Sequence, residues 1–114
     1  MIEYQERLRC FALNDDGFVS SVLGMGQSTV DVSRLDPKTH ALVRLTALIA
    51  VDSGSSTYNA GVEMALAAGA TFDEIVGLLI AMAPAIGLGR VVSAAPELAL
   101  ALGFDVEAAL ETRD

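Results

Sequence analysis

The sequence is poor in cysteine, aromatic residues and positive charge. Cys10 is the only cysteine, and aromatic residues make up 5% of the 114 residues, with no tryptophan. A single cysteine excludes an intramolecular disulfide, a CxxC redox pair and a thiolate metal cage, and it is typical of a reducing compartment. We therefore expect a cytoplasmic protein whose core is filled by Ala, Leu, Val and Ile.

Basic side chains are outnumbered by acidic ones, 7 against 15, which gives a formal charge of −8. Nucleic acids and anionic membrane surfaces both attract basic patches, so we expect neither as a partner. The longest uncharged run, residues 75–89, is shorter than the ~20 residues that a membrane span needs. The charged beginning, MIEYQERLRCF, is not expected to be a signal peptide.

Hydrophobic residues are abundant, at 53% of the chain. A chain of this length forms one domain, and small domains have a large surface for their volume. Because so much apolar surface cannot all be buried within one short chain, and exposed apolar patches usually mark interfaces, the composition predicts a homo-oligomer.

The first third of the chain, residues 1–34, has the weakest pattern. Apolar residues spaced among charges predict a short helix over residues 3–13. Asn-Asp-Asp-Gly at 14–17 predicts a turn. A second short helix is expected over residues 18–25, and residues 30–34 are expected to form an irregular connector.

A clearer helix start follows at Asp36-Pro37. Asp is a favoured N-cap acceptor, and proline is tolerated at the first helical position because its missing N–H has no partner there anyway. The pattern predicts a helix over residues 37–52, which ends at Ser53-Gly54 and enters the core in its second half.

A helical hairpin is expected next. Residues 55–68 are rich in Ala and Gly, Gly69 is suited to the left-handed position after a helix, and Thr71-Phe72-Asp73-Glu74 is a capping box. Gly61 lies in the middle of this first helix, where it costs about 1 kcal/mol against Ala. A packing or site reason must therefore favour glycine at that position.

The second helix of the hairpin, residues 72–86, is apolar on all sides after its first turn. Pro84 should kink it or end it early. Gly-Leu-Gly at 87–89 predicts a break, a further helix is expected over residues 90–102, and Asp105 is expected to cap a short terminal helix. Since no stretch alternates apolar and polar residues, we expect an all-α single domain over residues 1–114.

The patterns LDPKTHALVRLTALIA and ALAAGATFDEI together resemble the carboxymuconolactone decarboxylase family, which includes the alkylhydroperoxidase D-like proteins. The likeness covers about residues 35–102, and its most specific part is the hairpin motif at residues 65–75. The resemblance implies an all-helical bundle that assembles into dimers to hexamers. In this reading residues 1–34 are lead-in helices before the family-like core.

The reactive residues of that family do not carry over. In its peroxidase branch a CxxC pair precedes a histidine on the helix before the hairpin turn. Counting back from Gly69, those places fall at Gly54, Thr57 and Gly61. The resemblance therefore implies that thiol-based peroxide reduction is absent, because that chemistry needs a thiolate attacker. The histidine that also matters in the decarboxylase branch is replaced by Gly61.

Residues 54, 57, 58 and 61 share one face of a helix by their spacing. In the functional reading two glycines widen a pocket there, and the hydroxyls of Thr57 and Tyr58 act on a small ligand. In the structural reading the glycines allow close helix packing and Tyr58 belongs to the core. The sequence leaves both readings open.

Three cations are candidates for anion binding or acid–base chemistry. His40 is the only histidine, and its place in the polar first turns favours a surface role over catalysis. Arg44, one turn further on, forms a carboxylate clamp with His40 or pairs with an acid of another subunit. Arg90 is the best single candidate for an anion contact, with a salt bridge to Glu63 or Glu97 as the alternative.

No metal or cofactor is expected, because one histidine and one cysteine give no ligand set. Two functions remain. The first is a divergent family enzyme that acts on a small organic molecule, with an anion as the narrower case, and uses neither metal nor redox thiols. The second is a non-catalytic oligomeric helical module for ligand binding or assembly.

Overall fold

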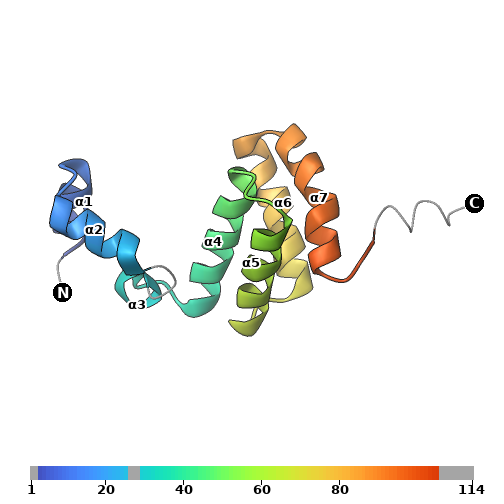
Figure 1. Ribbon diagram of the computed structural model, residues 1–114, viewed down its shortest axis with the longest axis horizontal. Coiled ribbons are helices and arrows are strands. Elements are labelled where there is room, and N and C mark those ends of the chain that lie inside the picture. Colours follow the sequence, from blue (N-terminus) through green and yellow to red (C-terminus); the bar gives the residue numbers. More distant parts are fainter. Residues whose placement is uncertain (1–2, 26–28, 106–114) are drawn as a thin grey trace, which may run out of the picture. The chain divides into compact units, whose positions relative to one another are not determined.

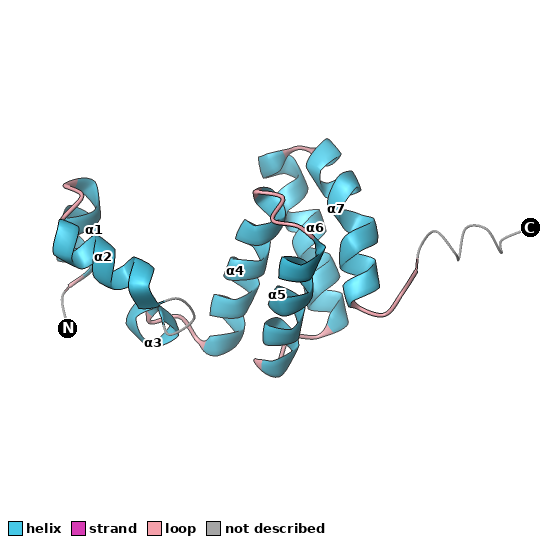
Figure 2. Cartoon of the chain, in the orientation of Figure 1, coloured by secondary structure: helices cyan, strands magenta, loops and turns pink. Residues whose placement is uncertain are grey.

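A computed structural model describes residues 3–25 and 29–105, and within these ranges the chain forms seven helices and no strand (Figures 1 and 2). The all-α prediction is confirmed. The short helix expected after Asp105 lies outside the described residues. The helices are α1 Tyr4–Ala12, α2 Asp16–Met25, α3 Thr29–Ser33, α4 Pro37–Ala50, α5 Ser55–Ala67, α6 Phe72–Ile86 and α7 Leu88–Ala101.

The chain divides into two compact units, residues 1–35 and residues 36–114. In the first unit, α2 begins where the N–H of Phe18 donates to the Asp15 carboxylate at 2.9 Å. The rings of Phe11 and Phe18 then join α1 to α2, edge to face, with centroids 4.8 Å apart. Among the described residues of this unit, Cys10 alone is buried, so the unit has almost no core of its own.

Helix α3 corrects the prediction of an irregular connector over residues 30–34. Its β-branched residues have low helix propensity, so the sequence pattern did not predict a helix there. Two contacts stabilise its end. The Ser33 hydroxyl donates to the Val30 carbonyl at 2.7 Å, and Nη1 of Arg7 donates to the Val32 carbonyl at 3.0 Å. These bonds satisfy carbonyls that a helix C-terminus leaves without partners.

The second unit opens with α4, whose start agrees with the prediction. The N–H of Thr39 donates to Asp36 Oδ1 at 2.9 Å, and Pro37 occupies the first turn. The helix ends at Ala50, two residues earlier than expected. Asp52 causes this early end, because its φ of 57° is left-handed and cannot continue a helix.

The hairpin between α5 and α6 is confirmed in detail. Gly69 has a φ of 101°, and the N–H of Ala70 donates to the Ala65 carbonyl at 2.9 Å. The capping box is complete, since the Glu74 N–H donates to Thr71 Oγ1 at 3.0 Å and the Thr71 N–H donates to Glu74 Oε1 at 2.9 Å. Glu74 also accepts from Nζ of Lys38 at 2.9 Å, which ties the start of α6 to α4.

The link from α6 to α7 is shorter than predicted. Pro84 does not end α6, which continues to Ile86; a proline so near the C-terminus removes little of the helical bonding. Gly87 alone, with a φ of 98°, separates the two helices. Leu88 and Gly89 are therefore helical, and Arg90 is the third residue of α7 rather than its first.

The core of the second unit lies where its four helices meet. Helix α4 packs on α5 and α6, and α7 packs on α5 and α6 (Figure 1). The largest fully buried side chains come from α4, α5, α6 and α7 alike. They are Tyr58, Leu45, Ile49, Ile75, Leu98 and Val62.

Candidate functional site

The turn after α4, the start of α5 and the start of α7 bring three polar side chains together, those of Asp52, Tyr58 and Arg90. Nη1 of Arg90 lies 3.0 Å from Oδ2 of Asp52. Tyr58, on the first turns of α5, lies close enough to both residues for their charges to shift the pKa of its hydroxyl. Sequence analysis had singled out Tyr58 and Arg90 separately. It had expected Arg90 to pair with Glu63 or Glu97, and that expectation is wrong, because the partner is Asp52.

Tyr58 is fully buried, with 0% of its surface exposed. Its hydroxyl makes no hydrogen bond of ordinary geometry with a described residue, although the Asp52 carboxylate is near enough to interact with it as an acceptor. A buried hydroxyl without a hydrogen bond lowers the free energy of unfolding by about 1–3 kcal/mol, so this arrangement destabilises the fold. Burial raises the pKa of the Tyr58 hydroxyl, the charge of Asp52 raises it further, and Arg90 opposes the shift. The phenol is therefore protonated at neutral pH and able to donate.

Asp52 occupies this site in an uncommon backbone conformation. Its φ of 57° lies in the left-handed region, which Asp tolerates better than most residues but which is still sparsely populated. The conformation turns the chain sharply between α4 and α5. Such backbone outliers collect at functional sites. No pattern in the sequence had marked Asp52 as a site residue.

Gly61 is explained by packing. A methyl group at this position would lie 3.1 Å from Cδ1 of both Leu45 and Leu48, closer than ordinary carbon contacts. The space beside Gly61 is thus filled by α4 side chains. At Gly54 a methyl group would meet nothing within 4 Å, but the φ of 96° favours glycine. Thr57 is half-buried next to Tyr58.

His40 and Arg44 are not part of the cluster around Tyr58. Along α4 they precede its last residue, Ala50, by about 15 Å and about 9 Å, at 1.5 Å per residue. The expected surface position of His40 is wrong, because only 8% of this residue is exposed. Arg44 is half-buried. Both residues already have an interaction partner.

Cys10 is buried in the first unit, and its sulfur lies 3.8 Å from Oε1 of Glu6. Burial and the neighbouring Glu6 charge raise the pKa of the thiol. A raised pKa keeps the group in the thiol form at neutral pH, whereas the thiolate is the nucleophile. Cys10 therefore lacks both the activation and the second cysteine that thiol redox chemistry uses.

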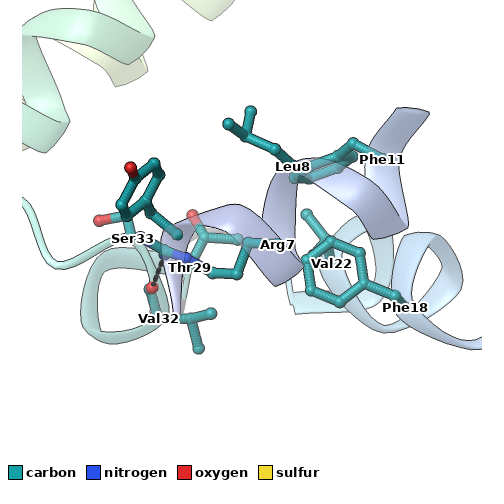
Figure 3. A pocket seen from close by; sticks show the side chains of 9 residues that line it. Arg7, Leu8, Phe11, Phe18, Val22, Thr29, Val32 and Ser33 are labelled. Atoms are coloured by element: carbon teal, nitrogen blue, oxygen red, sulfur yellow. Dashed lines mark hydrogen bonds between the residues drawn. The ribbon is translucent and has the colours of Figure 1, made fainter. Parts of the chain in front are cut away.

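The first unit also contains an apolar pocket of about 410 Å³, which sequence analysis missed. Phe11, Phe18 and Val22 line it, and Arg7 extends along it toward Val32 (Figure 3). Arg7 forms no ion pair within the described ranges. The pocket draws on α1, α2 and α3, and the last of these was not predicted, so its composition could not be read from the sequence.

Two kinds of site are not seen in the part of the chain that the structure describes. No group of three or more His, Cys, Asp or Glu side chains there is arranged to hold a metal ion. No helix there is both long and apolar enough to cross a membrane.

The model of the carboxymuconolactone decarboxylase family matches residues 17–100. The match begins in α2, well before the residue 35 expected from the sequence motifs, so α2 and α3 belong to the matched region. Comparison with curated proteins and with solved structures gave no match.

Proposed function

We propose that this chain, which belongs to the carboxymuconolactone decarboxylase family, binds and acts on a small organic anion at Tyr58, Asp52 and Arg90, without metal or redox thiols. The observation that carries the proposal is the buried Tyr58 hydroxyl, which makes no hydrogen bond of ordinary geometry beside the ion pair. A donor kept unpaired at a cost to stability is expected where a ligand uses it, since binding sites trade stability for function.

The ion pair suggests how an anion enters. The Asp52 side chain is 59% exposed, whereas that of Arg90 is 24% exposed. Asp52 can therefore turn into water at little cost while Arg90 stays in place. A carboxylate of the ligand then takes the position of Asp52 on the guanidinium, where two parallel hydrogen bonds are possible.

Tyr58 contributes a proton donor next to this cation. Because the pKa of its hydroxyl is raised, it donates a hydrogen bond to a ligand oxygen rather than competing with it as an anion. A fixed donor beside a positive charge stabilises negative charge that develops on a substrate oxygen during reaction. Thr57 adds a second hydroxyl on the same helix. The site therefore suits a reaction of a carboxylate substrate in which negative charge develops on a substrate oxygen in the transition state.

The test is a screen of small mono- and dicarboxylates by calorimetry against the wild-type protein and Arg90→Gln. Lys38→Gln is the matched control, because Lys38 is also a paired cation, bound to Glu74. We expect Arg90→Gln to weaken binding by about 10- to 100-fold, as for loss of a charged hydrogen bond, and Lys38→Gln to leave it unchanged. Equal weakening by both variants, or no binding of any carboxylate, would overturn the proposal.

A second candidate function is ligand binding without catalysis, in the first unit. The pocket there has the size of a small-molecule site, and Arg7 supplies one positive charge without an ion pair among the described residues. In this case Arg7→Gln, and not Arg90→Gln, should weaken carboxylate binding. The same screen therefore separates the two candidates.

A further inference from the structure

The pocket of the first unit combines an apolar lining with a single charged side chain (Figure 3). Phe11, Phe18 and Val22 line it from α1 and α2, and Val32 lines it from α3. Arg7 is the one charged residue among the described residues that line it. The pocket volume of about 410 Å³ lies within the range of about 300–1,000 Å³ that small-molecule sites span. A ligand that fills this pocket must therefore be largely apolar, and it can place one anionic group beside Arg7.

Helix α1 presents one face to this pocket. Its lining residues lie three, four and seven positions after the first of them and so share one side of the helix: Tyr4, Arg7, Leu8 and Phe11. Leu8 and Phe11 remain 63% and 52% exposed, so a ligand in solution can reach this face. Helix α1 ends at Ala12, whereas the family match begins at residue 17. This wall of the pocket therefore lies outside the region that matches the family.

Arg7 can bind an anion at this pocket without giving up an ion pair. Its guanidinium has five N–H donors, and within the described residues its one hydrogen bond runs from Nη1 to the Val32 carbonyl, at 3.0 Å. Glu6, the acid next to it in the chain, accepts instead from Nε of Arg9 at 2.9 Å. Because Arg7 is half-buried beside apolar side chains, a carboxylate can form charge-assisted hydrogen bonds with its remaining N–H groups where water is partly excluded.

We propose that this pocket binds a monomeric amphipathic monocarboxylate, with its carboxylate on Arg7 and its alkyl or aryl body against Phe18 and Val22. The inference rests on the second candidate function, because it names the ligand class of that same pocket. One cation matches one carboxylate, whereas a dicarboxylate would bring a second charge against an apolar wall, where a charge without a partner is unfavourable. A membrane surface fits less well, because anionic bilayers attract clusters of cations and the described lining of this pocket offers one.

Calorimetric titration of the full chain with straight-chain carboxylates, from butanoate to decanoate, tests this ligand class below the micellar concentration of each acid. Each methylene that enters the pocket should tighten binding by about 3- to 4-fold, until the pocket is full. Octanol should bind at least about 10-fold more weakly than octanoate, as expected when a charged hydrogen bond is lost. Octanedioate should also bind more weakly than octanoate. This series uses the wild-type protein, so it does not depend on the folding of a variant.

Arg7→Gln then tests whether the pocket is the place of binding. This variant should weaken octanoate binding by about 10- to 100-fold, because the charged partner of the carboxylate is gone. Arg9→Gln is the matched control, since it removes the same charge from the same helix at a residue that does not line the pocket, and it should leave the affinity unchanged. Circular dichroism should show the same helix content in both variants, so that a loss of affinity reports the charge and not a change in fold.

The outcomes separate the ligand class from the candidate function on which it rests. Binding that depends on Arg7 but is equally tight for butanoate and octanoate, or for octanol and octanoate, would overturn the amphipathic monocarboxylate and leave the second candidate function standing. Octanoate binding that Arg7→Gln leaves intact, or that Arg9→Gln weakens to the same extent, would overturn both. So would the failure of every acid in the series to bind.

Discussion

At the scale of single residues, the structure assigns roles that the sequence left open. Both readings of the face with Thr57 and Tyr58 were possible from the sequence, because spacing shows which side chains share a face but not what fills the space beside them. Leu45 and Leu48 fill it at Gly61. The partner of Arg90 could not be predicted either, since Asp52 is 38 residues away in the chain and reaches it only through a left-handed turn.

Gly61 gives the first test at this scale, with Gly77 as its matched control. Both are interior helix positions, but a methyl group at Gly77 would meet nothing within 4 Å. Gly77→Ala should raise the free energy of unfolding by about 0.5–1 kcal/mol through helix propensity. Gly61→Ala should lower it by about 1 kcal/mol, because crowding at Leu45 and Leu48 outweighs the same gain. Urea unfolding of both variants measures the difference; a stabilised Gly61→Ala would show that the site is loosely packed.

At the scale of elements, the chain's strongest local signals predicted α4, α5 and α6, and the side-chain caps that begin α4 and α6. Asp36 and Thr71 bond the backbone as their positions indicate, because a cap depends on neighbours in sequence. Helix α3 was missed for the opposite reason. Its β-branched residues argue against a helix, and the contact that stabilises its end comes from Arg7, 25 residues away.

The capping box of α6 gives a pH prediction. The hydrogen bond from Lys38 and the bond from the Thr71 N–H lower the pKa of Glu74 below its usual 4.5. A lowered folded pKa means that Glu74 stabilises the fold above about pH 4.5 and loses this contribution as the pH falls through the folded value. Part of the acid destabilisation of the protein should therefore come from Glu74.

Thermal unfolding between about pH 6 and about pH 3 measures this contribution in Glu74→Gln. Gln keeps the capping-box bond but loses the charge that Lys38 pairs with, so this variant should lose less stability on acidification than the wild type. Glu63→Gln, at an exposed position of α5, is the control and should follow the wild type. An unchanged pH profile in Glu74→Gln would show that other carboxylates cause the acid sensitivity.

At the scale of the whole molecule, the chain keeps the helical scaffold of its family without the residues of thiol chemistry. The family match over residues 17–100 agrees with the motifs read from the sequence. Gly54, Thr57 and Gly61 are the residues that the motif count of the sequence analysis sets against the reactive positions of the peroxidase branch, and none of them is Cys or His. The proposed site lies on the same helix, α5, at Tyr58. The scaffold could be predicted because its caps and glycines are local; the site could not, because it joins three helices.

The most direct test of the proposed site is a comparison of Tyr58→Phe with the wild type in two measurements, the free energy of unfolding in urea and the affinity for the best carboxylate found by calorimetry. Phe fills the same space without the unpaired hydroxyl, so the variant should be about 1 kcal/mol more stable. It should also bind the carboxylate about 10-fold or more weakly, because the donor is gone. A variant that binds as tightly as the wild type would contradict the account, whatever its stability.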